Sequence, residues 1–339
     1  MSKRIVTVFG GSGFLGRHVI SKLARQDVSI RVAVRRPEFA GFLCPMGSVG
    51  QVTLMQANVR DFGSVTRAIE GADAVVNLAG ILCERGQQIF SEVHATAAGR
   101  IARAASEAGV KRLIHVSAIG AKEEANSAYA RSKAAGETAL REAYPAATIL
   151  RPGVMFGTED DFFNKFGALA RISPVLPLFF AIRQMPKFHM EGLYMVPEIE
   201  AGTTRMQPVF VSDVADAITG ILDDSAEDSA GKTYELGGPN VYSFRELMEL
   251  IAKETQYKRL LVPVPYFAAD MMGFFMQFMP EPMFTADQAK MLRADNVVAE
   301  HALKLGDLGI AATPAEMILP TYMHRFRRAR MDSTPRAQT

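Results

Sequence analysis

A cluster of glycines near the N-terminus constrains this chain more than any other feature. Gly10, Gly13 and Gly16 are separated by two residues each, and they directly follow the apolar run 5–9. A strand, a tight glycine turn and a helix in this order bring helix N-terminal amides to face the pyrophosphate of a dinucleotide. Gly11 also completes the related spacing Gly-x-Gly-x-x-Gly. A glycine-rich turn without a ligand is the alternative, but the surrounding strand and helix favour a dinucleotide site.

Composition narrows the class of protein without indicating a function. The 339 residues are 48% hydrophobic, enough for one large core or for a core with a second lobe. Because 38 Lys and Arg nearly cancel 36 Asp and Glu, we expect no nucleic-acid partner. The two cysteines, Cys44 and Cys83, and the six histidines show no ligand spacing, so we expect neither a disulfide framework nor a metal site. No apolar run reaches the length of about 18 residues that a membrane span needs.

The first half of the chain alternates short β-branched runs with segments of helical periodicity. Right-handed crossovers would join these strands into one parallel sheet with the ligand crevice at the carboxyl ends. The expected fold class is therefore α/β, a Rossmann-type doubly wound parallel sheet with a smaller C-terminal lobe over the cofactor crevice. The expected strands are 5–9, 29–34, 52–55, 74–78, 112–117 and 147–150, and the expected helices are 15–25, 63–70, 90–108 and 128–142.

Beyond Pro152 this alternation weakens, and prolines, aromatic residues and methionines become frequent. We therefore expect an NADP(H)-binding domain at residues 1–152 and a mixed C-terminal lobe at residues 153–330, with segments that return to the Rossmann core. Residues 331–339 are expected to form a disordered tail.

The end of the second strand indicates which nucleotide binds. A ribose with a free 2′-hydroxyl is held by an acidic residue about 20 residues after the glycines, but Arg35 and Arg36 stand there. Arginine binds phosphate oxygens in bidentate geometry, so this pair favours a 2′-phosphate and hence NADPH. A solvated pair of arginines is the alternative. Asn58 and Asp61 are candidates for the adenine edge, and residues 78–80 are candidates for the nicotinamide ribose.

Tyr129 and Lys133 form a second group of candidate residues. Their spacing of four places the phenol and the ammonium on one helix face, and we expect the cation to lower the phenol pKa toward neutrality. Such a tyrosine can exchange a proton with a carbonyl or alcohol while a nicotinamide exchanges hydride. Ser117, at the end of the fifth strand, is placed to orient the carbonyl oxygen. An ordinary helix surface is the alternative interpretation.

These motifs together resemble the extended branch of the short-chain dehydrogenase/reductase superfamily. Later segments of the chain agree with it, at residues 150–157, 208–215 and 234–238. A narrower similarity, to the dehydrogenase-like accessory subunits of respiratory complex I, lies in residues 156–165, 285–288, 292–296, 308–310 and 319–322. This resemblance implies a peripheral subunit that holds NADPH for structure and contacts other complex I subunits near the junction of the peripheral and membrane arms.

The resemblance also implies a location and a set of site residues. Because no presequence precedes the first strand, the expected form is bacterial, at the cytoplasmic face of the inner membrane. Ser117, Tyr129 and Lys133 are implied as catalytic residues or as their remnants. The residues expected to contact the nucleotide are Gly10, Gly11, Ser12, Gly13, Phe14, Leu15, Gly16, Arg35, Arg36, Asn58, Val59, Leu78, Ala79, Gly80, Ser117, Tyr129, Lys133 and Pro152.

One residue departs from the superfamily pattern. The helix after the fourth strand offers an asparagine for proton relay in that superfamily, whereas this chain has His94 there. His94 is either a neutral, hydrogen-bonded substitute or the mark of a site without turnover, and the sequence leaves both open.

Three segments of the C-terminal lobe suit a partner surface. Residues 266–279 are apolar on nearly every helical face, which fits either an adaptable contact surface or a buried helix. The apolar stretch 174–182 and the basic tail 324–330 would suit lipid headgroups or an acidic neighbour, although solvated arginines are the alternative for the tail.

Three classes of function follow. The leading one is a non-catalytic, NADPH-holding accessory subunit of complex I. The second is a free-standing NADPH-dependent reductase or epimerase, based on Ser117, Tyr129 and Lys133. The third is a regulator that senses the NADPH/NADP ratio through the same pocket.

Overall fold

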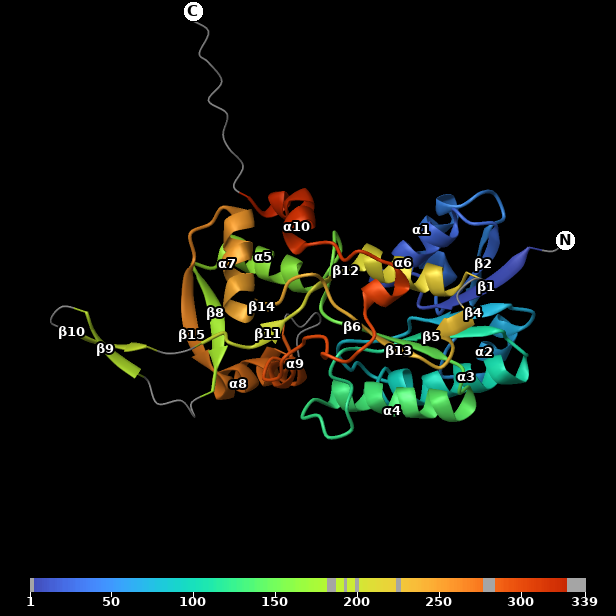
Figure 1. The fold of residues 1–339 in the computed structure, drawn as a ribbon, viewed down its shortest axis with the longest axis horizontal. Helices are drawn as coiled ribbons and strands as arrows, with labels where there is room; N and C mark the ends of the chain where they lie inside the picture. Colours follow the sequence, from blue (N-terminus) through green and yellow to red (C-terminus); the bar gives the residue numbers. More distant parts are fainter. Residues whose placement is uncertain are drawn as a thin grey trace, which may run out of the picture.

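The computed structural model describes residues 3–181, 201–223, 227–276 and 284–327, and it also assigns strands at 187–191 and 194–198. Figure 1 shows a sheet with its helices at one end of the molecule and a second lobe at the other. The tail 331–339 lies outside the described residues.

The larger lobe is built on a parallel sheet of seven strands in the order β3-β2-β1-β4-β5-β6-β13. Every neighbouring pair in this sheet runs parallel, which confirms the α/β doubly wound fold class. Strand β13 comes from the C-terminal half of the chain. The strands are β1 (Arg4–Phe9), β2 (Val28–Val34), β3 (Val52–Gln56), β4 (Ala74–Asn77), β5 (Arg112–Val116), β6 (Thr148–Pro152) and β13 (Thr233–Leu236).

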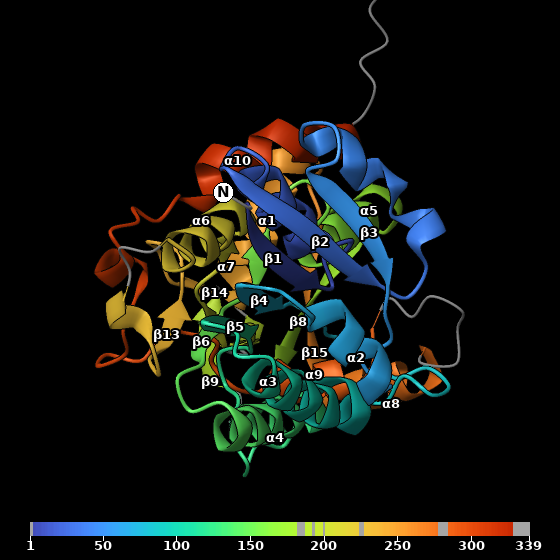
Figure 2. The same cartoon turned by 90° about the vertical axis from the view of Figure 1, so that its right-hand side faces the viewer.

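Helices cover both faces of this sheet (Figure 2). Helices α1 (Phe14–Leu23) and α6 (Val211–Ile221) pack on one face, where Val8, Val19 and Ile218 are fully buried. The opposite face carries α2 (Phe62–Ile69), α3 (Ala97–Glu107) and α4 (Ala128–Ala143) over a second buried cluster. The site residues predicted in the first half therefore lie on loops and helix starts around this sheet, except Lys133, which lies within α4, and Pro152, which ends β6.

The second lobe has its own core of aromatic and aliphatic side chains. Two parallel strands, β8 (Val175–Phe180) and β15 (Leu260–Pro265), carry helices around them. Leu176 and Leu178 are fully buried, so the expected role at a partner surface is wrong for these two residues, whereas Val175 is 38% exposed. Residue 182 of the stretch lies outside the described residues. The helices are α5 (Phe162–Ile172), α7 (Phe244–Thr255), α8 (Tyr266–Met276), α9 (Ala286–Met291) and α10 (Ala315–Met323).

Short strand pairs complete the secondary structure of the described residues. The pairs are β7 (Met155–Phe156) with β12 (Val209–Phe210), β11 (Arg205–Met206) with β14 (Tyr242–Ser243), and β9 (Lys187–Glu191) with β10 (Tyr194–Glu198). Among the described residues, no helix is long and apolar enough to cross a membrane.

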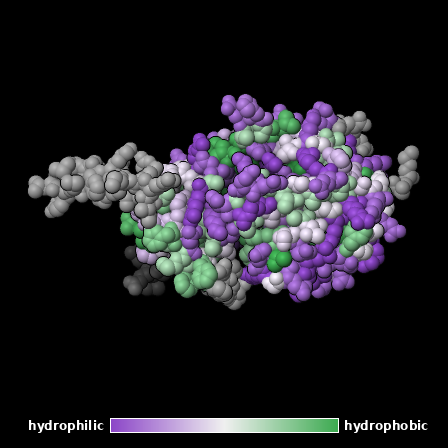
Figure 3. Space-filling model, turned by 90° about the horizontal axis from the view of Figure 1, so that it is seen from below, coloured by the Kyte–Doolittle hydropathy of each residue, from purple (hydrophilic) through white to green (hydrophobic). Residues whose placement is uncertain are grey.

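Helix α8 exposes most of its apolar side chains. Ala269 and Gly273 are buried, whereas Phe267 is 60% exposed and Phe275 is 66% exposed. Figure 3 shows this face, with hydrophobic residues gathered over the second lobe. Residues 277–279 lie outside the described residues. An exposed cluster of this kind fits a contact surface better than a buried helix.

Two arginines of the basic tail are used within the second lobe. Arg325 donates to the Thr158 carbonyl at 2.6 Å, and Arg327 donates to the Glu254 carbonyl at 2.7 Å. These two side chains therefore hold the lobe together, whereas residues 328–330 of the tail lie outside the described residues.

Candidate functional site

The glycines of the first loop are required for different structural reasons. Gly10 has a φ of +76°, and a Cβ there would stand 2.9 Å from the Leu78 carbonyl. A Cβ on Gly16 would stand 2.5 Å from the Gly10 carbonyl oxygen. The nearest neighbour of a Cβ on Gly13 is that same oxygen, at 3.3 Å. Gly10 and Gly16 are thus required by the packing of the chain itself, while Gly13 leaves space in front of α1.

The N-terminus of α1 fits an anion. Gly13 is its N-cap and has no side chain to cap the helix, and the first turn contains no acidic residue. Unpaired amides and the positive end of the helix dipole therefore face this space. Phe14 and Leu15 begin the helix at this point, so their amides suit the pyrophosphate of a dinucleotide.

A cleft with a volume of about 530 Å³ lies beside the glycine loop. Arg35 and Arg36 line it, and a third arginine, Arg60, joins them. The Arg36 guanidinium lies 5.8 Å from the centre of the Phe39 ring. Three cations in one cleft suit a phosphate ester. The lining residues are Ser12, Val34, Arg35, Arg36, Phe39, Arg60 and Gln88.

Arg60 was not among the residues predicted to bind the nucleotide, although it lies between the predicted residues Val59 and Asp61. The Asn58 side-chain oxygen accepts from the Arg60 amide at 3.1 Å and so shapes this loop. Asp61 instead caps α2, accepting from the Gly63 amide at 3.2 Å, which gives it a structural role. Val59 packs half-buried against the core under α2 and α3.

Tyr129 and Lys133 share one face of α4 as predicted, but their titration differs from the prediction. The Lys133 Nζ atom lies 5.8 Å from the centre of the Tyr129 ring and donates to the Val116 carbonyl at 3.1 Å. Burial raises the pKa of Tyr129 to about 12. Burial also lowers the pKa of Lys133 to about 8, an effect that the Glu137 carboxylate opposes. The expected shift of the phenol pKa toward neutrality is therefore wrong, because loss of hydration outweighs the attraction of the cation.

His94 lies in a π-helical segment, Ser91–Thr96, and is fully engaged inside the protein. Its Nε2 accepts from the Ile81 amide at 3.0 Å, so Nδ1 carries the proton and donates to the Ser132 hydroxyl at 2.8 Å. Burial and the Lys133 charge lower the pKa of His94 to about 2. His94 is thus neutral and hydrogen-bonded, and both of its ring nitrogens already have partners.

Ser117 offers a buried polar atom at the same end of the crevice. Its Oγ is buried and has no hydrogen-bond partner among the described residues. The neighbouring Asn77 donates to His115 Nδ1 at 3.0 Å and accepts from the Ala79 amide at 3.1 Å, which fixes the turn that leads to Gly80. Because an unpaired buried hydroxyl costs free energy, Ser117 is suited to a polar ligand atom.

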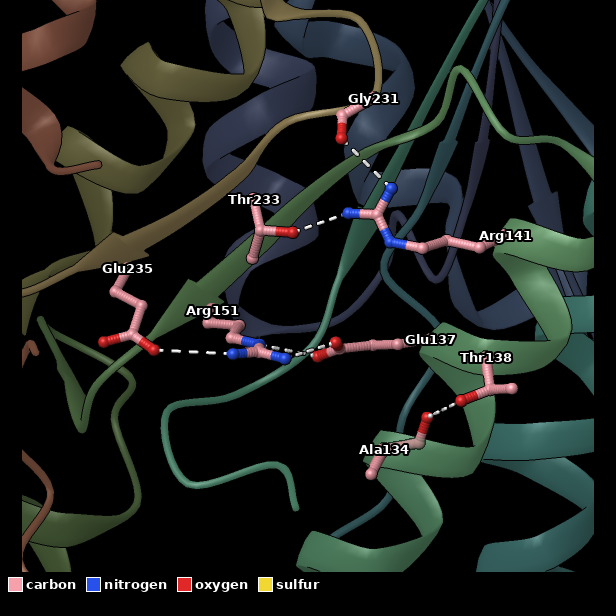
Figure 4. A network of polar contacts seen from close by, with 8 residues as sticks. All are labelled: Ala134, Glu137, Thr138, Arg141, Arg151, Gly231, Thr233 and Glu235. Carbon is pink, nitrogen blue, oxygen red and sulfur yellow. Dashed lines mark hydrogen bonds and ion pairs between the residues drawn. The ribbon is translucent and has the colours of Figure 1, made fainter. Parts of the chain in front are cut away.

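Helix α4 is held rigidly against the sheet (Figure 4). Arg151 of β6 donates to both Glu137 oxygens, at 2.9 and 2.6 Å, and lies 3.5 Å from Glu235 of β13. Arg141 reaches the Thr233 hydroxyl at 2.6 Å. Pro152, which ends β6, accepts from the Ile119 amide at 3.0 Å beside Ser117. The helix that carries Tyr129 and Lys133 is thereby tied to both strands at this edge of the sheet.

The candidates thus follow one line along the carboxyl ends of the strands. A Cβ on Gly80 would lie 3.4 Å from Lys133 Nζ and 3.7 Å from His94 Nε2, so the turn after β4 lies next to α4 and the His94 segment. The described residues contain no group of three or more His, Cys, Asp or Glu side chains that could hold a metal ion. The glycine loop and the three arginines lie at one end of the line and the Tyr129 group at the other.

This arrangement defines a dinucleotide-binding protein of the dehydrogenase type, and comparison with known proteins agrees. The chain belongs to the NAD dependent epimerase/dehydratase family, whose model matches residues 6–237. It is similar to the mitochondrial NADH dehydrogenase (ubiquinone) 1 alpha subcomplex subunit 9 of Arabidopsis thaliana, at 36% identity over 90% of this chain and 74% of that protein. The subunit of the same name from Mus musculus is 32% identical over 99% of this chain and 84% of that protein. The resemblance predicted from the sequence is confirmed.

The fold is also found among solved structures. The NADPH-dependent quinone oxidoreductase of Escherichia coli, solved with NADPH, is 19% identical and superimposes with a TM-score of 0.69. That likeness covers 94% of this chain and 99% of the solved one, and at this identity it bears on the fold alone.

Proposed function

We propose that this chain is an accessory subunit of an NADH:quinone oxidoreductase of the complex I type, that it holds NADPH, and that it has no turnover of its own. The observation that carries the assembly role is the similarity to subunit 9 proteins over nearly the whole chain. The peripheral position, on the cytoplasmic side of a bacterial membrane and near the junction of the two arms, is part of the same proposal.

The choice of NADPH rests on charge. Arg35, Arg36 and Arg60 surround the cleft beside the glycine loop, where a 2′-phosphate would lie. Ser117, Tyr129 and Lys133 would face the nicotinamide half. A bound nicotinamide would supply hydride transfer, whereas the protein residues would hold its ribose and amide.

The absence of turnover is supported by the proton chemistry of the site. A tyrosine with a pKa near 12 keeps its proton at neutral pH, so it is a poor general base, and the neutral His94 already has a partner at each ring nitrogen. The free-standing reductase or epimerase remains the second candidate, because Ser117, Tyr129 and Lys133 are all retained and close together.

Purification of the native assembly tests this function. A tagged full-length chain, extracted with mild detergent, should elute with NADH:quinone oxidoreductase activity and should release one equivalent of NADPH on denaturation. A chain that elutes alone, without nucleotide or oxidoreductase activity, would contradict the proposal.

The exposed face of α8 is the proposed contact with the rest of the complex. Replacing Phe267 and Phe275 by Glu should release the chain from the complex while its circular dichroism stays unchanged, because both side chains are exposed. Met317→Glu, at an exposed apolar residue of α10, is the matched control. Loss of cooperative unfolding in the α8 variant would show that this face is part of a core.

A further inference from the structure

A carboxylate from the second lobe closes the N-terminus of α4. Asp287, in α9, accepts from the Ser127 hydroxyl at 2.8 Å, from the Ala128 amide at 2.7 Å and from the Tyr129 amide at 3.0 Å. Ser127 is itself the N-cap of α4 and accepts from the Ala130 amide at 3.2 Å. Ser127 and Asp287 thus share the free amides of the first turn, and Asp287 adds a negative charge at the positive end of the helix.

These bonds act directly on the nicotinamide end of the site. Tyr129 is the second residue of α4, so Asp287 holds its backbone, and Lys133 follows on the next turn of the same face. The Arg151 and Arg141 contacts secure the later turns of α4, from Glu137 onward. Asp287 is therefore the tether of the turn that carries the phenol.

The segment around Asp287 is itself held in place. Thr285 and Gln288 cap α9 reciprocally, at 3.2 and 3.0 Å. A Cβ on Gly273 of α8 would stand 2.6 Å from the Ala286 amide, so α8 and α9 pack backbone to backbone (Figure 1). Further along, Asn296 accepts from the Val154 amide at 3.1 Å beyond β6. Because the segment that carries Asp287 is fixed on both sides of this residue, the Asp287 carboxylate can restrain helix α4.

We propose that Asp287 is a positioning residue of the nucleotide site, which sets the first turn of α4 and with it the placement of Tyr129 and Lys133 against the nicotinamide half of NADPH. The proposal rests on the nucleotide-holding function proposed above. It assigns a function to residues 285–288, a segment of the second lobe that contributes no side chain to the predicted set of nucleotide contacts.

Calorimetry with two ligands separates this role from a merely structural one. NADPH reaches both ends of the site, whereas 2′,5′-ADP carries the adenosine and the 2′-phosphate without a nicotinamide. Asp287→Ala in the full chain should weaken NADPH binding about tenfold and 2′,5′-ADP binding by less than about twofold. Asp287→Asn keeps one acceptor oxygen, so its affinity for NADPH should fall between those of wild type and Asp287→Ala. If the alanine variant does not fold, the asparagine variant provides the test.

Asp213→Ala is the matched control. Asp213 also ties two segments together, accepting from the Thr313 amide at 2.7 Å and its hydroxyl at 3.0 Å, but it contacts α4 through neither bond. Its loss should lower the unfolding temperature and leave the affinities for both ligands unchanged.

The outcomes distinguish the two proposals. If the Asp287 variants lower the unfolding temperature but keep the wild-type ratio of NADPH to 2′,5′-ADP affinity, Asp287 is only structural and the inference is overturned. If wild type binds NADPH no more tightly than 2′,5′-ADP, the inference fails while the nucleotide-holding function stands. If wild type binds neither ligand, both proposals fail.

Discussion

The two ends of the nucleotide crevice differ in how their polar groups are satisfied. At the adenosine end, Arg35 and Arg36 are exposed along an open cleft, and the space before α1 faces helix amides. At the other end, Lys133 and His94 are buried and already hydrogen-bonded to the protein. The first end offers exposed guanidinium groups and helix amides that suit a phosphate, whereas the Lys133 and His94 side chains of the second end already have partners within the protein. We therefore expect nucleotide binding and turnover to be separable properties of this site.

The largest effect is expected from Gly13→Val. The fold should tolerate it, because a Cβ there meets only the Gly10 carbonyl oxygen at 3.3 Å, but the side chain would fill the space before α1. We expect NADPH binding to weaken at least about 100-fold. The stabilisation that the nucleotide gives at 100 times its dissociation constant, about 2.7 kcal/mol, should disappear from thermal unfolding curves.

Gly41→Val is the control for this change, since a Cβ at Gly41 meets nothing within 4 Å. It should keep the rise in unfolding temperature with NADPH. If NADPH still raised the unfolding temperature of the Gly13→Val protein, the adenosine end of the crevice would not be part of the binding site.

A smaller effect is expected at the arginine cleft. Wild type should bind NADPH at least about tenfold more tightly than NADH, or about 1.4 kcal/mol, because guanidinium groups bind the 2′-phosphate. Arg35→Asp should narrow that gap, and Arg67→Asp, on the exposed side of α2, should not. Calorimetry with both nucleotides measures it, and equal wild-type affinities would contradict the 2′-phosphate argument.

The pH dependence of binding probes the buried end. Burial places the pKa of Lys133 at about 8, below the ordinary value of 10.5, so the ammonium loses its proton as the pH rises above 8. We expect NADPH affinity to be full below pH 8 and to fall above it, by up to about tenfold per pH unit. The free protein should change in the opposite sense, because a lowered lysine pKa adds stability as the pH rises from 8 toward 10.5.

Titration calorimetry and thermal unfolding between pH 7 and about 10 measure both trends. Lys133→Gln should flatten both profiles. A wild-type affinity that does not fall above pH 8 would mean that the Lys133 charge takes no part in holding the nucleotide.

The predictable parts of this molecule are those recorded in local sequence. The glycine loop and the sheet could be predicted because a turn with φ of +76° and a run of β-branched residues leave a local pattern. The role of Asp287 could not be predicted, because its hydrogen-bond partners lie about 160 positions earlier and no local sequence pattern indicates such a contact. The Tyr129 pKa was predicted in the wrong direction because spacing places Lys133 nearby but does not reveal the burial of the phenol.

The smallest effect is expected from Tyr129→Phe. The change removes one hydroxyl and keeps the ring in its edge contacts with Phe90 and His94, at 5.8 and 5.2 Å. Because a phenol with a pKa near 12 stays protonated at neutral pH, no charge is lost. NADPH affinity should change by less than about threefold, the range of one modest hydrogen bond. The chain should still copurify with normal NADH:quinone oxidoreductase activity. Gly13→Val is the reference, because a chain that loses its nucleotide should be less stable and depleted from the complex.

Loss of a measurable NADPH-dependent reaction in Tyr129→Phe, with nucleotide still bound, would instead make the free-standing reductase the better account of this site.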